Sequence, residues 1–424
     1  MKRVALVTSH FPPSNLVGVH RARIWAQFLP EYGWKPTVIT AHWKHYQEPL
    51  DWNLLSLVSD DTEVVRTNAL DLRYAKILGN MALRAMWWTR KALRRLAESG
   101  QLDFMHIIVP DHYSALLGPM LHKSHRIAYG IDYMDPWVHA SPSEKRFLSK
   151  AWLSCVLSYH LEPWSIRSAR LITGVSASSY VSVLKRNAPH TDGVVTAEIP
   201  MANASSDYRA LSGGFKPDVT LFDPSDGRIH FVYAGTIPSA FFESLQCFLA
   251  SLSECVDENI FRDTVRVWLI GTGTNADTSR TSRVEKEIER FSLAEHVSEH
   301  PPRIGYLDTL WHLKAASALL ILGSTEIHYT PSKVYQATQS GKPVIAFVSE
   351  RSGAAEILRS SGRGYVVNFP DERRTVVRSA KCALTAIAAA RRGTTALHFD
   401  DSRTCAARAG ARRLAESLDK ACLG

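Results

Sequence analysis

The stretch ALLILGSTEIHYTPSKVYQATQSGKPVIAF, residues 318–347, decides the expected fold of this chain. It opens with an apolar run, 318–322, that predicts a buried strand, and it closes with a second such run, 344–347. Between them lie a polar loop, a short helix predicted to begin at Pro331 and a Ser-Gly-Lys-Pro turn. In an open α/β sheet, a loop between a strand and a helix lies at the carboxyl edge, where ligands bind. This loop is therefore the first candidate site.

The start of the predicted helix suits an anion. Thr330 can cap it, and Pro331 fits the first turn, where its missing N–H would be unpaired anyway. Free backbone N–H groups from Ser332 onward, the helix dipole and the Lys333 ammonium together favour a phosphate. The alternative is an ordinary capped helix with a solvated lysine, since such caps are common.

Length and composition limit the possible classes. A chain of 424 residues is too long for one ordinary core and predicts two α/β domains of about 200 residues each. The apolar runs are strand-sized, which predicts that no segment spans a bilayer. Residues 1–8 lack a signal-like cleavage region and predict a first strand, so we expect a cytoplasmic protein.

The charged and metal-binding residue types point to an anionic partner. The net charge of +9 favours nucleotide sugars, phospholipid headgroups or nucleic acid, and charge alone does not choose among them. The six cysteines show no CxxC pair and the 17 histidines show no HExxH motif, so we expect no protein-bound metal.

Two stretches of the 318–347 segment together match a known family. Pro331-Ser332-Lys333-Val334-Tyr335-Gln336 and Ser340-Gly341-Lys342-Pro343-Val344-Ile345 resemble the P-S-K-x-F/Y-E-Y-x-x-S/A-G-K-P-V-I segment of family 4 retaining glycosyltransferases of the GT-B fold. The resemblance implies an α/β protein with two Rossmann-like, doubly wound domains that face each other across a cleft. It implies that Lys333 and the helix start hold the diphosphate of a nucleotide sugar. It also implies that Glu326 touches the sugar and that Gln336, which stands where the family has an acid, binds the ribose.

Glycine turns after two predicted strands extend the resemblance. Gly235-Thr236 follows the strand 229–234, and Gly271-Thr272-Gly273 follows the strand 265–270. Both resemble family loops that approach the nucleotide, although glycine serves any tight turn of this kind. The Arg and Lys that many members carry after the first glycine are absent here, so Lys333 and Arg303 are the expected diphosphate ligands.

The N-terminal half offers candidates for the acceptor side. A strand at 3–8, a loop with Gly18, a helix at 19–32 and a strand at 37–40 predict the start of a doubly wound sheet. Arg21, at the helix start, is expected either to hold a phosphate or to form a surface salt bridge. Asp132 and Asp135 follow the strand expected at 126–131. By resemblance they orient acceptor hydroxyls, with turn capping as the alternative.

Residues 73–98 predict a basic amphipathic helix. One arc is apolar and contains Trp88, while the opposite arc is basic and also contains Trp87. A tryptophan within a basic face is typical of an interfacial helix, which favours docking on an anionic membrane. The alternative is a solvated helix packed on the sheet. The expected membrane residues are Arg84, Trp87, Trp88, Arg90, Lys91, Arg94 and Arg95.

The expected organisation follows from these segments. Residues 1–203 form an acceptor domain, 204–227 a linker rich in Ser, Gly, Asp and Pro, and 228–400 a nucleotide-sugar domain. By resemblance, residues 401–424 form a terminal helix that crosses back to the first domain.

The leading functional hypothesis is a glycosyltransferase that moves a sugar from a nucleotide-sugar co-substrate to a hydroxyl acceptor. By resemblance the sugar's configuration is retained and the acceptor is lipid-linked or a polysaccharide. We expect catalytic roles for Asp135, Glu326 and Lys333, and donor contacts from Gly235, Thr236, Gly271, Gly273, Arg303, Thr330, Ser332 and Gln336. We expect no cofactor, no nucleic-acid partner, and a location in the cytoplasm, peripheral on the inner face of the membrane. The alternatives are a non-catalytic nucleotide-sugar or membrane scaffold and a sugar-nucleotide epimerase of the same architecture.

Overall fold

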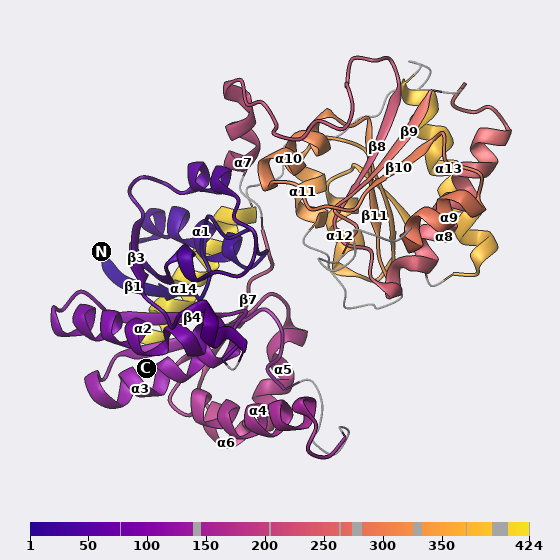
Figure 1. The fold of residues 1–424 in the computed structure, drawn as a ribbon. Coiled ribbons are helices and arrows are strands. Elements are labelled where there is room, and N and C mark those ends of the chain that lie inside the picture. Colours follow the sequence, from indigo (N-terminus) through magenta and orange to yellow (C-terminus); the bar gives the residue numbers. More distant parts are fainter. Residues whose placement is uncertain are drawn as a thin grey trace. The chain divides into compact units, whose positions relative to one another are not determined.

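The chain folds into two compact units, seen in a computed structural model that describes residues 1–76, 78–138, 146–202, 205–262, 264–273, 282–324, 333–369, 371–391 and 406–423. Unit 1 comprises Met1–Ala204 with Cys405–Gly424, and unit 2 comprises Ser205–Thr404. Each unit is a parallel sheet with helices on both faces (Figure 1). The predicted α/β class with two doubly wound sheets is confirmed.

Unit 1 contains a seven-stranded sheet in the order β3-β2-β1-β4-β5-β6-β7, with every neighbouring pair parallel. Its strands are β1 Lys2–Val7, β2 Trp34–Ala41, β3 Glu63–Thr67, β4 Phe104–Val109, β5 Ala128–Tyr133, β6 Leu171–Gly174 and β7 Val195–Glu198. The strand order reverses between β1 and β4. In doubly wound sheets ligands bind at the carboxyl edge beside such a reversal, and we call this position the crevice of the unit.

The helices of unit 1 form two layers, one on each face of the sheet. They are α1 Val19–Phe28, α2 Met81–Glu98, α3 Leu117–His125, α4 Lys150–Ile166, α5 Ala177–Arg186, α6 Ala188–Thr191 and α14 Ala406–Leu423, with 3-10 turns η1 Leu29–Tyr32, η2 Trp43–His45, η3 Trp52–Leu57, η4 Leu72–Lys76 and η5 His112–Leu116. Val4 and Leu6 of β1 point to the core beneath α1 and α14. Ala5 and Val7 point to the core beneath α2, α3, α4 and α5. The alternation of a strand therefore separates the two layers.

Unit 2 repeats the same winding with six strands in the order β10-β9-β8-β11-β12-β13. The strands are β8 Ile229–Ala234, β9 Val265–Ile270, β10 Val297–His300, β11 Ala318–Leu322, β12 Val344–Val348 and β13 Gly364–Asn368. The helices are α7 Ser205–Arg209, α8 Phe242–Asp257, α9 Arg283–Arg290, α10 Tyr306–Ala315, α11 Lys333–Gln339, α12 Gly353–Ser360 and α13 Arg373–Arg391, with 3-10 turns η7 Ala210–Gly213 and η8 Ser239–Phe241. Here the order reverses between β8 and β11.

Some boundaries differ from the sequence-based expectations. β5 begins at Ala128 rather than 126 and continues to Tyr133, so Asp132 lies inside the strand instead of after it. The helix expected over 73–98 is interrupted: a 3-10 turn ends at Lys76, and α2 begins at Met81. The Asn80 side chain caps α2 by accepting a hydrogen bond from the Leu83 N–H at 3.3 Å.

The segment expected to be a linker packs on unit 2. The Phe222 ring is buried and stacks on His230, with centroids 4.3 Å apart. The Asp218 N–H donates to Asp308 at 3.1 Å, and the Leu221 N–H donates to His312 at 3.2 Å. These contacts hold residues 218–222 of the segment against unit 2, while residues 223–227 are exposed.

None of the helices that the structure describes combines the length and the apolar character needed to cross a bilayer.

Candidate functional site

The crevice of unit 2 brings together three loops that are distant in sequence. Gly235 follows β8, Gly271 follows β9, and Lys333 opens the described part of α11, which comes after β11. The Gly235 N–H donates to the Ile270 carbonyl at 2.7 Å, which ties the first two loops together. All three therefore lie at the carboxyl edge where the strand order reverses, the usual place for a ligand in this type of sheet.

Lys333 points its amino group at the loop after β8. Its Nζ donates to the Tyr233 hydroxyl at 2.8 Å and lies 4.3 Å from the centre of that ring. The Tyr233 hydroxyl in turn donates to the Thr236 carbonyl at 2.7 Å, and this contact fixes the orientation of the phenol. The lysine head is thus held in place by a buried aromatic side chain.

Gly235 is required beside this lysine for two reasons. Its φ of +130° lies in the region that side chains rarely adopt. A Cβ at this position would also lie 2.3 Å from the Lys333 Nζ, well inside van der Waals contact. The missing side chain leaves the space that the lysine head occupies.

The electrostatics around Lys333 favour an anion. Burial first, and then the nearby Arg303 guanidinium, lower the pKa of Lys333 to about 7. Arg303 is exposed and comes from the loop after β10. A phosphate between the two cations would reverse this shift, because an opposite charge favours the ammonium form.

The other two predicted glycines, Gly271 and Gly273, lie next to that loop. The nearest atoms to a Cβ on Gly271 would be the Arg303 Cα and Cγ at 3.9 Å, and the φ of Gly271 is +68°. A Cβ on Gly273 would lie 3.0 Å from the Pro301 carbonyl oxygen. Gly273 therefore allows Pro301 to approach the edge of the sheet closely, whereas Gly271 is favoured by its positive φ and not by a lack of space.

Part of the predicted donor site lies outside the described residues. This applies to Glu326, Thr330 and Ser332. Gln336 lies in α11, partly buried, and its backbone carbonyl accepts a hydrogen bond from the Tyr208 hydroxyl at 2.8 Å. That bond joins α7 to α11.

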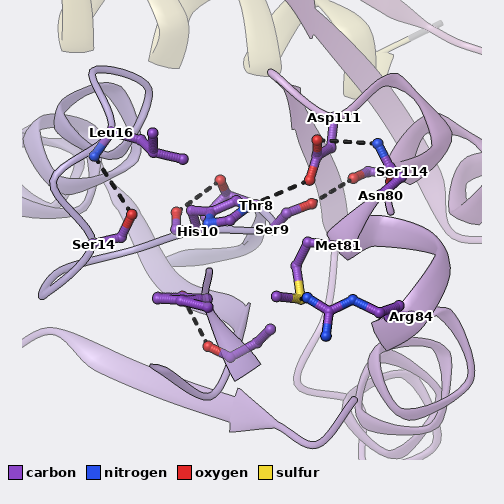
Figure 2. A network of polar contacts seen from close by, with 12 residues as sticks. Thr8, Ser9, His10, Ser14, Leu16, Asn80, Met81, Arg84, Asp111 and Ser114 are labelled. Atoms are coloured by element: carbon purple, nitrogen blue, oxygen red, sulfur yellow. Dashed lines mark hydrogen bonds and ion pairs between the residues drawn. The ribbon is translucent and has the colours of Figure 1, made fainter. Parts of the chain in front are cut away.

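The crevice of unit 1 holds a cluster that the sequence did not reveal, built around His10 after β1 (Figure 2). The His10 Nδ1 contacts the Glu48 carboxylate at 2.7 Å, and its Nε2 lies 3.6 Å from the Asp111 carboxylate after β4. Asn80 donates to Asp111 at 3.1 Å. We call His10, Glu48 and Asp111 the edge triad.

The edge triad has a defined charge at neutral pH. Burial alone would lower the pKa of His10, but the two carboxylates outweigh it and raise this pKa to about 9. Burial alone would raise the pKa of each carboxyl group, yet His10 lowers both. One imidazolium between two carboxylates has a net charge of −1, and carboxylates in this setting can accept hydrogen bonds from hydroxyl groups.

The sequence offers a signal for two members of the edge triad but not for the third. His10 and Asp111 each follow a predicted strand by a few residues, as ligand-binding residues often do. The sequence does not show that β1 and β4 are neighbours, however, and Glu48 lies in a loop without a pattern.

The structure brings Arg21 and Asp132 together in the interior of unit 1. Two guanidinium nitrogens of Arg21 donate to the two Asp132 oxygens at 2.5 and 2.7 Å, and a third donates to the Ile199 carbonyl at 2.7 Å. Asp132 also accepts from Thr173 at 2.6 Å. Both charged groups are buried because β5 runs through Asp132. The pair links α1 to the sheet instead of presenting its charges to a ligand.

Gly18 and Asp135 lie nearer the surface. A Cβ on Gly18 would lie 3.4 Å from the Met134 sulfur and 3.5 Å from Pro110, which places it beside the ends of β4 and β5. Asp135 is exposed, and its backbone carbonyl is 2.9 Å from the His112 Nε2.

One of the predicted membrane residues is buried, and that part of the prediction is corrected. Arg84 lies inside unit 1 and donates to the carbonyls of Leu70 at 3.1 Å and His45 at 2.8 Å. The helical wheel drawn for one continuous helix over residues 73–98 places Arg84 on the exposed basic face. The remaining members are partly or fully exposed on α2: Trp87, Trp88, Arg90, Lys91, Arg94 and Arg95.

Known proteins resemble this chain in structure but not in sequence. No protein-family model and no curated protein sequence matches the chain. HepE from Anabaena, solved with UDP and glucose, matches with a TM-score of 0.58 at 13% identity, over 99% of this chain and 100% of its own. This is the GT-B fold. A glycosyltransferase from Rickettsia africae matches with a TM-score of 0.54 at 13% identity over 98% of both chains.

The chain is also similar in structure to a protein described as an epimerase. A putative UDP-N-acetylglucosamine 2-epimerase from Listeria monocytogenes matches with a TM-score of 0.52 at 11% identity, over 99% of this chain and 96% of its own. At such identities the likeness establishes the fold, and the chemistry must be argued from the site. Within the described residues, no group of three or more His, Cys, Asp or Glu side chains is placed to hold a metal ion.

Proposed function

We propose that the protein is a glycosyltransferase that moves a sugar from a nucleoside-diphosphate sugar to a hydroxyl acceptor. The observation that carries the proposal is the Lys333 amino group, held by Tyr233 in the space beside Gly235 at the crevice of unit 2. Because its pKa is lowered by burial and Arg303, it is suited to a ligand that brings negative charge. The complexes of HepE with UDP and with UDP-glucose support this choice of ligand.

The proposed reaction breaks the bond between the sugar's anomeric carbon and the diphosphate oxygen. The same carbon forms a bond to the acceptor oxygen, and the acceptor hydroxyl loses its proton. Lys333 and Arg303 stabilise the charge that develops on the departing diphosphate. In this proposal Gln336 binds the ribose, Glu326 contacts the sugar, and the configuration is retained. Gly235, Thr236, Gly271 and Gly273 let the backbone approach the nucleotide, and Thr330 and Ser332 contact it.

On the acceptor side we propose that unit 1 binds a hydroxyl-rich molecule, lipid-linked or a polysaccharide. The edge triad offers two carboxylates and an imidazolium at its crevice, and the exposed Asp135 offers a further carboxylate. Carboxylates accept hydrogen bonds from sugar hydroxyls and can take a proton from one.

Calorimetric titration with UDP, GDP and ADP tests the donor site. We expect one nucleotide to bind selectively, and Lys333→Ala to weaken it by about 1.5–3 kcal/mol, the value of a charge-assisted contact. Lys286→Ala is the matched control, since Lys286 is an exposed lysine on α9 of the same unit. Equal affinity in wild type and Lys333→Ala would remove this lysine from the site.

Two further outcomes separate the alternatives. Conversion of a UDP-sugar without any acceptor would favour an epimerase. The structural similarity to the Listeria protein is the reason to test this outcome. Binding of no nucleotide would favour a scaffold, because Gln336 and the missing Arg and Lys after Gly235 remove charges that the family normally has.

A further inference from the structure

Helix α4 exposes an apolar stripe. Leu153, Leu157 and Trp164 are 48%, 49% and 37% exposed, and their spacing of four and seven residues places them on one side of the helix. Phe147 and Leu148, just before the helix, are 70% and 68% exposed. Large apolar side chains gathered in this way on a helix are unusual on a surface that meets only water.

The backbone conformation just before α4 contributes to the exposure of these apolar side chains. Leu148 has a φ of +57°, a left-handed conformation that leucine seldom adopts. The next residue, Ser149, caps the helix by accepting from the Trp152 N–H at 3.1 Å. The strained leucine is thus held outward, next to Phe147.

The charges around the stripe are basic. Arg146, Arg167 and Arg170 are exposed. The one acid between residues 146 and 170 is Glu162, which is buried and accepts hydrogen bonds from Arg186 at 2.9 and 3.0 Å. The outer surface of this segment therefore combines apolar and positively charged side chains.

The neighbouring helices continue the same pattern. α2, α3 and α4 lie in one layer, since all three pack on the core beneath one face of the sheet, and α3 contacts both of the others (Figure 1). α2 exposes Arg90, Lys91, Arg94 and Arg95, and Lys123 and Arg126 are exposed at the end of α3. Within residues 81–98 and 117–126 the one acid is Glu98, which pairs with Arg94 at 2.7 Å.

We propose that the outer surface of α2, α3 and α4, here called the lipid-docking face, rests on an anionic bilayer into which α4 inserts its apolar stripe. Basic side chains near an anionic surface each strengthen binding by about fivefold, and Trp, Phe and Leu bury their apolar parts at the acyl boundary. α4 lies on the bilayer and does not cross it. A face with this excess of positive charge repels a second copy of itself, so an anionic lipid surface is the occupant that its charge complements.

The inference assigns the apolar contact to α4, whereas the sequence pointed only to α2. It does not rest on the proposed transfer reaction, because membrane binding can be measured without a nucleotide. A lipid-linked acceptor would gain from it, since the protein and the acceptor would share one surface.

Co-sedimentation with vesicles tests the proposal. Wild-type protein is expected to bind vesicles of phosphatidylglycerol and phosphatidylcholine and to bind phosphatidylcholine alone at least tenfold more weakly. The variant Leu153→Gln, Leu157→Gln, Trp164→Gln is expected to lose at least tenfold in binding to the anionic vesicles. Trp52→Gln with Leu55→Gln is the matched control, because both side chains are exposed apolar residues of unit 1 outside the three helices. This control is expected to bind like wild type.

A second variant distinguishes insertion from a loss of folding. Brominated lipid quenches tryptophans that enter the acyl region, and Trp164→Phe keeps the apolar character of α4. We expect Trp164→Phe to bind vesicles but to show less quenching than wild type. Undiminished binding of the triple variant, or equal quenching in Trp164→Phe, would overturn the role of α4. Concentration-dependent dimers in light scattering that the triple variant abolishes would overturn it in favour of a second copy.

Discussion

At the scale of single residues, Lys333 is a side chain whose charge we expect to depend on the ligand. Burial and Arg303 lower its pKa to about 7, so above pH 7 the ligand-free protein has mostly a neutral amine there. A diphosphate favours the ammonium form, and its binding must then be accompanied by uptake of a proton.

We therefore expect nucleotide affinity to fall as pH rises above 7, by up to about tenfold per pH unit. Calorimetry at pH 8 in buffers of different ionisation enthalpy is expected to report uptake of close to one proton. Lys333→Ala removes the titrating group and is expected to abolish both effects. A flat affinity between pH 7 and 9 in the wild type would contradict the assignment.

Gly235 offers a second prediction at this scale. Gly235→Ala places a methyl group 2.3 Å from the present position of the Lys333 Nζ, so the lysine head must move. Nucleotide affinity is expected to fall about as far as in Lys333→Ala, with a loss of about 1–2 kcal/mol in stability from the backbone conformation. Gly227→Ala is the matched control, because Gly227 also has a positive φ, +80°, but a Cβ there would meet no atom within 4 Å. Gly227→Ala is expected to lose stability and to keep its nucleotide affinity. If Gly235→Ala kept its nucleotide affinity and Gly227→Ala lost it, the space beside Gly235 would be unimportant for binding.

At the scale of elements, the edge triad ties the loop after β1 to the loop after β4. The pKa of His10 is raised from an ordinary 6.5 to about 9, so the folded state binds its proton more tightly than the unfolded state does. Its contribution to stability is complete below pH 6.5 and is lost as pH rises toward 9.

The comparison of wild type with His10→Gln measures this contribution. At pH 6 the variant is expected to be less stable by about 2–4 kcal/mol, because two carboxylates lose their common cation. The difference is expected to narrow steadily up to pH 9 in denaturant unfolding. A constant difference over that range would mean that His10 contributes through packing and not through its charge.

Helix α2 shows how one element divides its basic residues between two roles. Arg84 is buried and donates to two backbone carbonyls, of Leu70 and His45, whereas Arg90 on the same helix is exposed. Arg84→Ala leaves those carbonyls without their donor, and we expect a loss of about 2–4 kcal/mol in urea unfolding. Arg90→Ala is the control and is expected to change stability by less than about 0.5 kcal/mol. Similar values for the two variants would contradict the distinction.

At the scale of the whole molecule, each unit carries its candidate site at the point where its strand order reverses. In the proposed transfer Lys333, Arg303 and backbone groups stabilise the charge on the departing diphosphate, so we expect the transfer to need no metal ion. We expect activity to survive EDTA once the donor is known. Loss of activity that Mg²⁺ or Mn²⁺ restores would contradict this mechanism and point to a metal held with the substrate.

The sequence by itself determined the alternation of strands and helices, because periodicity and glycine turns are local properties. The strands 229–234 and 265–270 and the glycines after them are predicted in this way. Lys333 could be proposed for the same reason: a helix start after a buried strand is visible in a few residues.

Only the tertiary structure decided which charges meet. Arg21 pairs with Asp132, 111 residues later, and His10 meets Glu48 and Asp111, because the sheet winds outward from β1 in both directions. A helical wheel likewise shows which side of α2 is basic but not that Arg84 lies under a loop. The free energy of a charged side chain depends on its burial and on partners that the fold brings close. Neither can be predicted from the residues next to it in the sequence.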